Sequence, residues 1–135
     1  MKKSLIAGLG LVVSATVTAE DVTGVTRMVC ASGQAQICLE TGECYAAAPF
    51  ELAVPDFVII DTKKGVISTT KASGLNRSTE FTKSERKDGL IYLQGVEGGR
   101  AFSFVIHETT GRMTAAIARD GLSVTVFGAC TATDL

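Results

Sequence analysis

The second half of this chain alternates apolar and polar residues with a period of two, and no other feature constrains the fold as strongly. Successive side chains of a β-strand point to opposite faces of the sheet, so this pattern gathers the apolar side chains of each strand on one face. Segments 101–108, 112–118 and 122–127 all show it, and their apolar positions are Phe102, Phe104, Ile106, Met113, Ala115, Ile117, Leu122, Val124 and Val126. Three successive strands that each carry one apolar row indicate an all-β core.

Short turns containing glycine separate the predicted strands. Two β-rich runs joined by such a turn are typical of a β-hairpin. Hairpins are predicted for 57–61 with 66–70, for 77–84 with 90–94 and for 101–108 with 112–118, and a last strand for 122–127. Turns that recur about every 8 to 12 residues indicate a barrel or sandwich. The sequential order favours a small antiparallel up-and-down β-barrel or a strongly curved meander sheet.

The chain before residue 57 gives weaker signals. Pro49 and Pro55 bracket segment 50–54, which is expected to be an edge strand or an extended connector because proline cannot donate to a β-ladder. The other expected elements are a strand over 25–31, a turn at Ser32-Gly33, short strands over 36–39 and 44–47 around a Thr41-Gly42 turn, and a loop over 71–76.

The first 19 residues have the pattern of a cleaved secretory signal peptide. Two lysines follow Met1, an apolar run extends from Leu5 to Val17, and small residues precede a cleavage point after Ala19. That run is shorter than the roughly 20 residues that span a bilayer. The expected mature protein is one all-β domain over 20–135, periplasmic or secreted, without a membrane span.

The four cysteines are expected to form two disulfides. An even number of cysteines in an exported chain indicates a disulfide framework, and four cysteines allow three pairings. Cys38 with Cys44 and Cys30 with Cys130 is favoured, because a Thr41-Gly42 hairpin would bring the first pair together. The alternative pairs Cys30 with Cys38 and Cys44 with Cys130. The gaps of seven, five and 85 residues between the cysteines do not fit the close pairs of a zinc site.

Charge argues against nucleic acid and anionic membranes as partners. The full chain has 13 Lys and Arg against 14 Asp and Glu. Loss of the two N-terminal lysines leaves 11 against 14, a net charge of −3. A negative protein is repelled by polyanions. The expected partner is therefore an envelope protein or a small molecule.

No catalytic constellation is recognisable, and we expect no enzyme activity, no cofactor and no metal. His107 is the only histidine, and its strand neighbour Glu108 faces the opposite side, so we expect a solvent-facing histidine. Nothing resembles a Gly-x-Ser-x-Gly elbow. The glycine-rich segment 95–100 lacks the Gly-Lys-Ser/Thr ending of a phosphate-binding loop and is interpreted as a turn.

Two basic hairpin tips are candidate partner contacts. Lys63 and Lys64 occupy one tip, and Arg86 and Lys87 lie at another. If both hairpins point the same way, these side chains would form a positive rim for an acidic partner. The alternative is that exposed tips are charged for solubility.

The chain resembles small exported β-proteins of Gram-negative bacteria in its clustered Cys30, Cys38 and Cys44, its glycine-turn hairpins and its terminal Phe127-Gly-Ala-Cys130. It is also similar, more faintly, to the membrane-bound inhibitors of c-type lysozyme. That resemblance implies a small periplasmic barrel with an inhibitory Ser-Gly loop, which Ser73-Gly74 would provide. The chain departs from the pattern because Leu75 and the residues after it lack the expected aromatic side chain, and the lipoprotein cysteine is missing.

Three functional hypotheses follow. The first is a non-enzymatic binding module for a protein or a small envelope molecule. The second is a carrier of a small apolar ligand, with room made inside the barrel by Ala101, Ala115 and Gly95. The third is an inhibitor of a lysozyme-like enzyme that acts through Ser73-Gly74.

Overall fold

Ten β-strands form one antiparallel sheet in the computed structural model, which describes Gly8, Gly10 and residues 20–135. The predicted signal peptide, residues 1–19, lies outside the described residues apart from these two glycines. The elements are β1 (Arg27–Leu39), β2 (Cys44–Ala47), the 3-10 helix η1 (Pro49–Leu52), β3 (Phe57–Asp61), β4 (Val66–Thr69), the 3-10 helix η2 (Lys71–Ser73), β5 (Ser78–Glu80), β6 (Lys83–Lys87), β7 (Leu90–Glu97), β8 (Arg100–His107), β9 (Arg112–Arg119) and β10 (Leu122–Ala132). The all-β prediction is confirmed.

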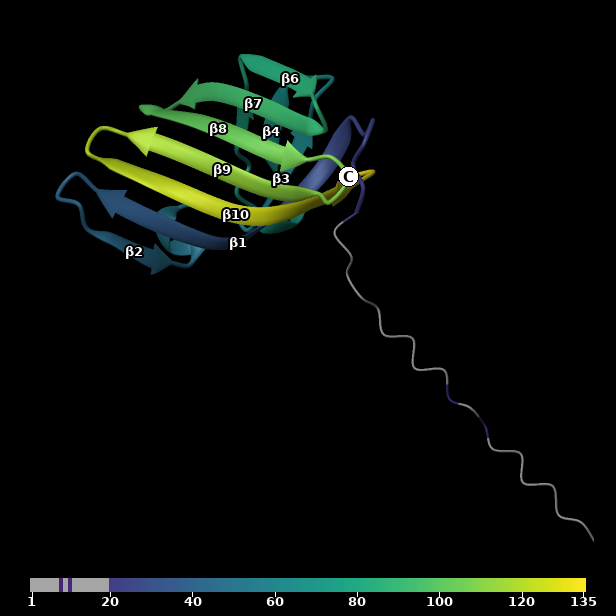
Figure 1. Cartoon of the computed structure of the whole chain (residues 1–135), viewed down its shortest axis with the longest axis horizontal. Helices are drawn as coiled ribbons and strands as arrows, with labels where there is room; N and C mark the ends of the chain where they lie inside the picture. The colour runs from purple at the N-terminus through teal and green to yellow at the C-terminus, as the bar shows by residue number, and fades with distance from the viewer. Residues whose placement is uncertain (1–7, 9, 11–19) are drawn as a thin grey trace, which may run out of the picture.

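The sheet is a curled meander in which the first and last strands pair. Its order is β5-β4-β3-β1-β10-β9-β8-β7-β6, and β2 pairs with the second half of β1. Figure 1 shows the curl, with β3 and β4 behind β7, β8 and β9. The edge strands β5 and β6 are consecutive in the chain: the amide of Phe81 donates to Gly65 O at 3.0 Å, and that of Thr82 donates to Gln94 O at 2.9 Å. The connector between the edges therefore hydrogen-bonds to both sides of the opening.

β1 passes straight through the turn predicted at Ser32-Gly33. Its pairing with β10 shifts between Ser32 and Gln34, which makes Gly33 the extra residue of a β-bulge. Cys30 and Ile37 are both buried although they lie seven positions apart, a spacing that would put them on opposite faces of a regular strand. The bulge restores the inward orientation. The turn prediction was wrong because one strand with a bulge and two strands with a turn have similar local sequences.

Three other predicted elements differ in the structure. Segment 50–54 is not extended: η1 begins at Pro49, whose fixed φ suits a first helical position. Segment 77–84 is not one strand paired with 90–94, since β5 pairs with β4 and β6 pairs with β7. The last strand continues to Ala132 because it pairs with β1 along most of its length.

Two disulfides join neighbouring strands. Cys30 bonds Cys130, and the two residues are direct register partners on β1 and β10. Cys38 bonds Cys44 across the β1–β2 hairpin. The favoured pairing is confirmed, and the alternative pairing is excluded in this structure.

One end of the curled sheet, which we call the packed end, is filled by large apolar side chains. Met28, Ile60, Ile91 and Ile106 are all completely buried there. Val22, in the segment before β1, is also completely buried, and its amide donates to Glu108 O at 2.7 Å. This segment therefore covers the packed end, and any open space inside the curl must lie toward the other end.

Candidate functional site

A cavity of about 100 Å³ lies inside the curl, toward the end opposite Val22, and opens to solvent. Its walls come from eight strands and from the segment Ala53–Pro55, and its apolar residues include Val58, Ile67, Phe102, Phe104, Ile117 and Val126. A cavity this large exceeds the space needed by one water molecule. It is smaller than the roughly 300–1,000 Å³ of pockets for drug-sized ligands. The space therefore suits a short or narrow ligand.

Small residues contribute to the cavity differently from the sequence-based expectation. Ala115 is buried and lines the space, as expected. Ala101 is exposed on the outer face of β8. Gly95 leaves no room, because the ring of its cross-strand partner Phe102 occupies the place of a side chain: a Cβ on Gly95 would lie 2.9 Å from Phe102 Cε1. Only Ala115 of the three opens the interior.

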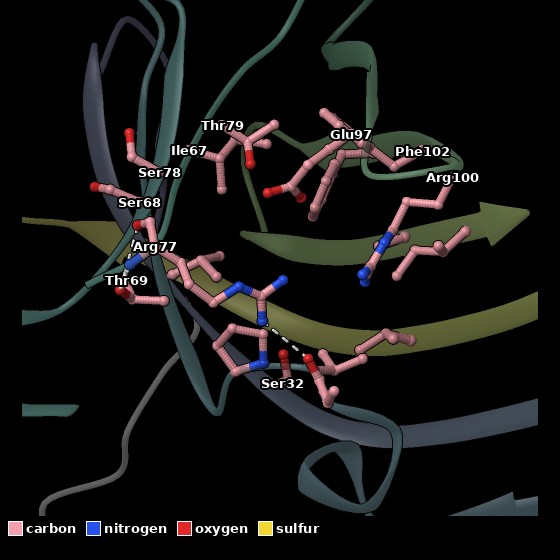
Figure 2. Close-up of a pocket in the computed structure, with 18 of the residues that line it drawn as sticks. Ser32, Ile67, Ser68, Thr69, Arg77, Ser78, Thr79, Glu97, Arg100 and Phe102 are labelled. Carbon is pink, nitrogen blue, oxygen red and sulfur yellow. Dashed lines mark hydrogen bonds between the residues drawn. The ribbon is translucent and has the colours of Figure 1, made fainter. Parts of the chain in front are cut away.

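Arg77 reaches the cavity from the residue just before β5. Its guanidinium Nη1 donates to Ala53 O at 3.0 Å. Its backbone amide donates to Thr69 Oγ1 at 2.9 Å, and Thr69 N donates to Arg77 O at 2.9 Å. These bonds hold the backbone of Arg77 against β4 and its side chain against the cavity wall, where Figure 2 shows the guanidinium directed into the hollow.

Arg100 enters the same space from the start of β8. Its Nε is buried and has no hydrogen-bond partner among the described residues. A buried donor without an acceptor costs about 1–3 kcal/mol, and more when the group is charged. Figure 2 shows the Arg100 guanidinium pointing toward that of Arg77 across the hollow. A guanidinium group without an ion-pair partner in residues 20–135 therefore lies beside the apolar walls, with its Nε covered by the protein.

Glu97 is the acidic residue of the lining. It is half-buried and is the register partner of Arg100 across the β7–β8 hairpin. The ion pairs within residues 20–135 are Arg27 with Asp61 at 2.9 Å and Arg86 with Glu108 at 3.3 Å. Neither cavity arginine is thus neutralised by a carboxylate in this part of the chain. Two guanidinium groups and one carboxylate leave the lining with a net charge of +1.

The predicted contact residues Ser73 and Gly74 lie outside the cavity, at the end of η2. The Ser73 hydroxyl donates to Thr70 O at 2.7 Å and accepts from Leu75 N at 3.2 Å. Gly74 has φ 68° and ends the 3-10 turn, a conformation that favours glycine. Both residues are exposed, and the inhibitory role implied by the lysozyme-inhibitor resemblance stays a prediction.

The basic tips lie at the packed end. The register places Asp61 of β3 and Lys87 of β6 at the same end of the sheet, so Lys63, Lys64 and Lys87 project there and are exposed. Arg86 is engaged differently, because its guanidinium bonds Glu108 and the carbonyl of Val25. A positive rim for an acidic partner stays a prediction, with Arg86 already occupied by contacts within the chain.

Asp61 stabilises the β3–β4 turn that carries Lys63 and Lys64. The amides of Lys64 and Lys63 donate to its Oδ1 at 2.9 and 3.1 Å, and Arg27 donates to its Oδ2 at 2.9 Å. The bond from Lys64 lowers the pKa of this carboxyl most, Arg27 and Lys63 add to that, and burial acts in the opposite direction. Asp61 is therefore a structural turn residue, charged at neutral pH.

His107 is the last residue of β8. Its Nδ1 is 3.2 Å from Thr109 Oγ1 and 3.3 Å from Thr110 N. The residue is half-buried, so it is less exposed than the solvent-facing position expected from the sequence. Among the described residues, no three His, Cys, Asp or Glu side chains are grouped to hold a metal ion. No helix in this part of the chain is long and apolar enough to cross a membrane.

Sequence reasoning missed Arg77, Arg100 and Glu97 as a site. Glu97 and Arg100 flank the Gly98-Gly99 turn within the glycine-rich segment, which was interpreted as a connector alone. The sequence offered one signal for this site, a charged residue on each side of a tight turn. It offered none for Arg77, which reaches the same site only because the sheet curls. Comparisons of the chain with known protein families, curated proteins and solved structures find no match.

Proposed function

We propose that this protein is an exported, non-enzymatic binding protein that holds a small, largely apolar ligand inside its curled sheet. The observation that carries the proposal is the cavity of about 100 Å³ with apolar walls and an open mouth. Apolar lining with a few polar groups is the usual character of small-ligand sites. Of the hypotheses drawn from the sequence, the small-ligand carrier is the one that this geometry favours.

The compartment belongs to the same proposal. Two disulfides tie the sheet together, and structural disulfides persist in oxidising compartments. Together with the N-terminal signal peptide predicted for residues 1–19, they support export to the periplasm or the medium. A binding protein in that location meets ligands of the cell envelope.

In this proposal the disulfide-linked strands keep the wall of the site rigid, and the cavity holds the ligand. Cys30–Cys130 joins the central strands β1 and β10, and both sulfur atoms lie in the core. Val126, on the same strand β10, lines the cavity. A rigid wall lowers the entropy lost on binding, because less of the site has to be ordered when the ligand enters.

A titration followed by ¹H–¹⁵N NMR tests the proposal, with 1-hexanol as a neutral probe. We expect shift changes concentrated at cavity residues such as Phe104, Ile117 and Val126. Ala115→Leu fills the space and should abolish these changes. Ala101→Leu adds the same side chain to the outer face of β8 and should leave them intact.

Two results would contradict binding in the cavity. The first is a titration in which the amides of the lining do not respond to 1-hexanol. The second is an identical response from the protein with Ala115→Leu, which would place the probe elsewhere on the molecule. Native mass spectrometry of the purified protein adds an independent readout, since a ligand retained from the cell would appear as a mass increment lost in Ala115→Leu.

A further inference from the structure

We propose that the ligand carries a carboxylate head, and that Arg100 and Arg77 bind this head at the mouth while a short apolar chain enters the cavity. This inference rests on the proposed function, because it assigns the chemistry of the ligand for the same site. It starts from Arg100, whose buried Nε lacks an acceptor among the described residues. The same guanidinium forms no ion pair within residues 20–135 and is directed into the hollow (Figure 2), where its terminal N–H groups can donate to an anionic oxygen.

Arg77 supplies the second donor group. Its Nη1 is already bonded to Ala53 O, which fixes the guanidinium against the wall and leaves its other N–H groups for a ligand. Figure 2 shows the two guanidinium groups converging on one hollow from opposite walls. The planar fork of arginine matches the two oxygens of a carboxylate, and charge-assisted bonds of this kind are about twice as strong as neutral ones.

The apolar walls of the cavity determine the chemistry of the ligand's tail. Phe102 and Phe104 pack edge to face with centroids 5.8 Å apart, and together with Ile117 they form an apolar wall of the cavity. A polar tail would lose its hydration there without gaining hydrogen bonds. A single short alkyl chain ending in a carboxylate matches both parts of the site.

Glu97 opposes this head group. Its carboxylate lies at the same mouth (Figure 2) and would repel a bound anion. Glu97 therefore limits the affinity for the ligand, and removing its charge should strengthen binding. Substitutions of Arg100 and of Glu97 are thus expected to act in opposite directions at one site, a pattern that a purely structural role of either residue would not produce.

The test compares hexanoate with 1-hexanol at low ionic strength and neutral pH on the full-length mature protein, by NMR titration. Hexanoate should bind about tenfold more tightly than 1-hexanol, because it adds charge-assisted hydrogen bonds to the same chain. Arg100→Gln should weaken hexanoate binding several-fold, because one of the two guanidinium groups is lost, and should affect 1-hexanol binding much less. Glu97→Gln should tighten hexanoate binding several-fold.

Arg112→Gln is the matched control, because Arg112 is an exposed arginine at the start of β9 that does not line the cavity. It should change neither affinity. Arg100→Lys keeps the charge but loses the planar fork, and an intermediate affinity for hexanoate is expected.

The outcomes separate this inference from the proposed function. Binding of 1-hexanol with no preference for hexanoate would overturn the carboxylate site and leave the apolar cavity as the binding site. An equal loss of both probes in Arg100→Gln would show that Arg100 shapes the cavity and would also overturn it. Failure of both probes to bind the unsubstituted protein would contradict the proposed function itself.

Discussion

The packed end and the cavity end of the curled sheet are built from the same strands but filled in opposite ways. At the packed end, completely buried Met28, Ile60 and Ile106 leave no room, and Val22 covers the opening. At the cavity end, the corresponding inward positions hold Ala115 and Arg100, and a space of about 100 Å³ remains. One sheet thus combines a dense core with an unfilled one.

This difference separates stability from binding. Close packing at one end contributes dispersion and hydrophobic energy that offsets the conformational entropy of folding. The open apolar space at the other end lacks these packing contacts, and the buried guanidinium donor there has no hydrogen-bond partner within residues 20–135. Both features reduce stability. Functional sites commonly carry such a cost, and the rest of the fold compensates for it. Substitutions that treat the two ends alike should therefore give unequal results.

The largest effect is expected from the disulfide that holds the central strands. Replacement of Cys30 and Cys130 by alanine should lower the free energy of unfolding by about 4–5 kcal/mol, because the bond closes a loop with a sequence separation of 100. Replacement of Cys38 and Cys44, with a separation of 6, should cost only about 2 kcal/mol. Urea denaturation of both double variants measures the difference, and equal losses would show that loop length does not control it.

The second-largest effect is expected from truncating a core side chain, which should cost more stability at the packed end than at the cavity end. Ile60→Ala at the packed end should cost about 2–5 kcal/mol, since Ile60 is completely buried and its truncation leaves a cavity in the core. Ile117→Ala beside the cavity should cost about 1 kcal/mol, because Ile117 is half-buried and already borders open space. The same urea experiment compares them, and a larger cost at Ile117 would contradict the assignment of the packed end.

Enlarging a side chain should change the stability in opposite directions at Gly128, which is tightly packed, and at Ala115, which borders the cavity. A Cβ on Gly128 would run into Ala31 O and lie 2.8 Å from Met113 Cε, so Gly128→Ala should destabilise by about 1–3 kcal/mol. Ala115→Leu extends into the cavity and should be neutral or stabilising by up to about 1 kcal/mol. Thermal unfolding tests both, and a strong loss in Ala115→Leu would mean that the space at β9 is not available.

The smallest effect concerns acid. The pKa of Asp61 is lowered in the folded state, so its charged form stabilises the protein above the pKa of the unfolded carboxyl, about 4. That contribution is lost as the pH falls from about 4 through the lower folded pKa. Asp61→Asn should therefore show a flatter decline of stability below pH 4. Unfolding midpoints between pH 2 and 7 measure the slope, and an unchanged slope would assign the acid sensitivity to other carboxyl groups.

Much of the fold could be predicted because it depends on local patterns. The inward rows on β8, β9 and β10 were visible as alternation, and the glycine turns placed the hairpins from β3 to β4 and from β8 to β9. The bulge at Gly33 escaped, because its signal is a change of phase between Cys30 and Ile37 that becomes meaningful only when both are known to face the core. The edge strands β5 and β6 were predicted as one strand, because no local sequence pattern shows that β5 pairs with β4 while β6 pairs with β7.

The candidate site was far less accessible. Segment 95–100 was predicted as a turn, and Ala115 as a small interior residue, but neither prediction pointed to Glu97 or Arg100. Arg77, however, reaches them only because the sheet curls and brings β5 opposite β8. The favoured pairing of the four cysteines rested on a predicted hairpin, and the structure confirms it by placing Cys30 directly across from Cys130 in the register of β1 with β10.

By itself, the sequence determined the class of the fold, the direction in which each late strand faces and the number of covalent links, because these follow from periodicity and composition along the chain. Only the tertiary structure decided where the interior is dense and where it is hollow. Filling depends on the summed volumes of side chains from strands that lie far apart in sequence. Two arginines separated by 23 positions meet at one mouth because the curvature of the sheet, rather than any local pattern, brings them together.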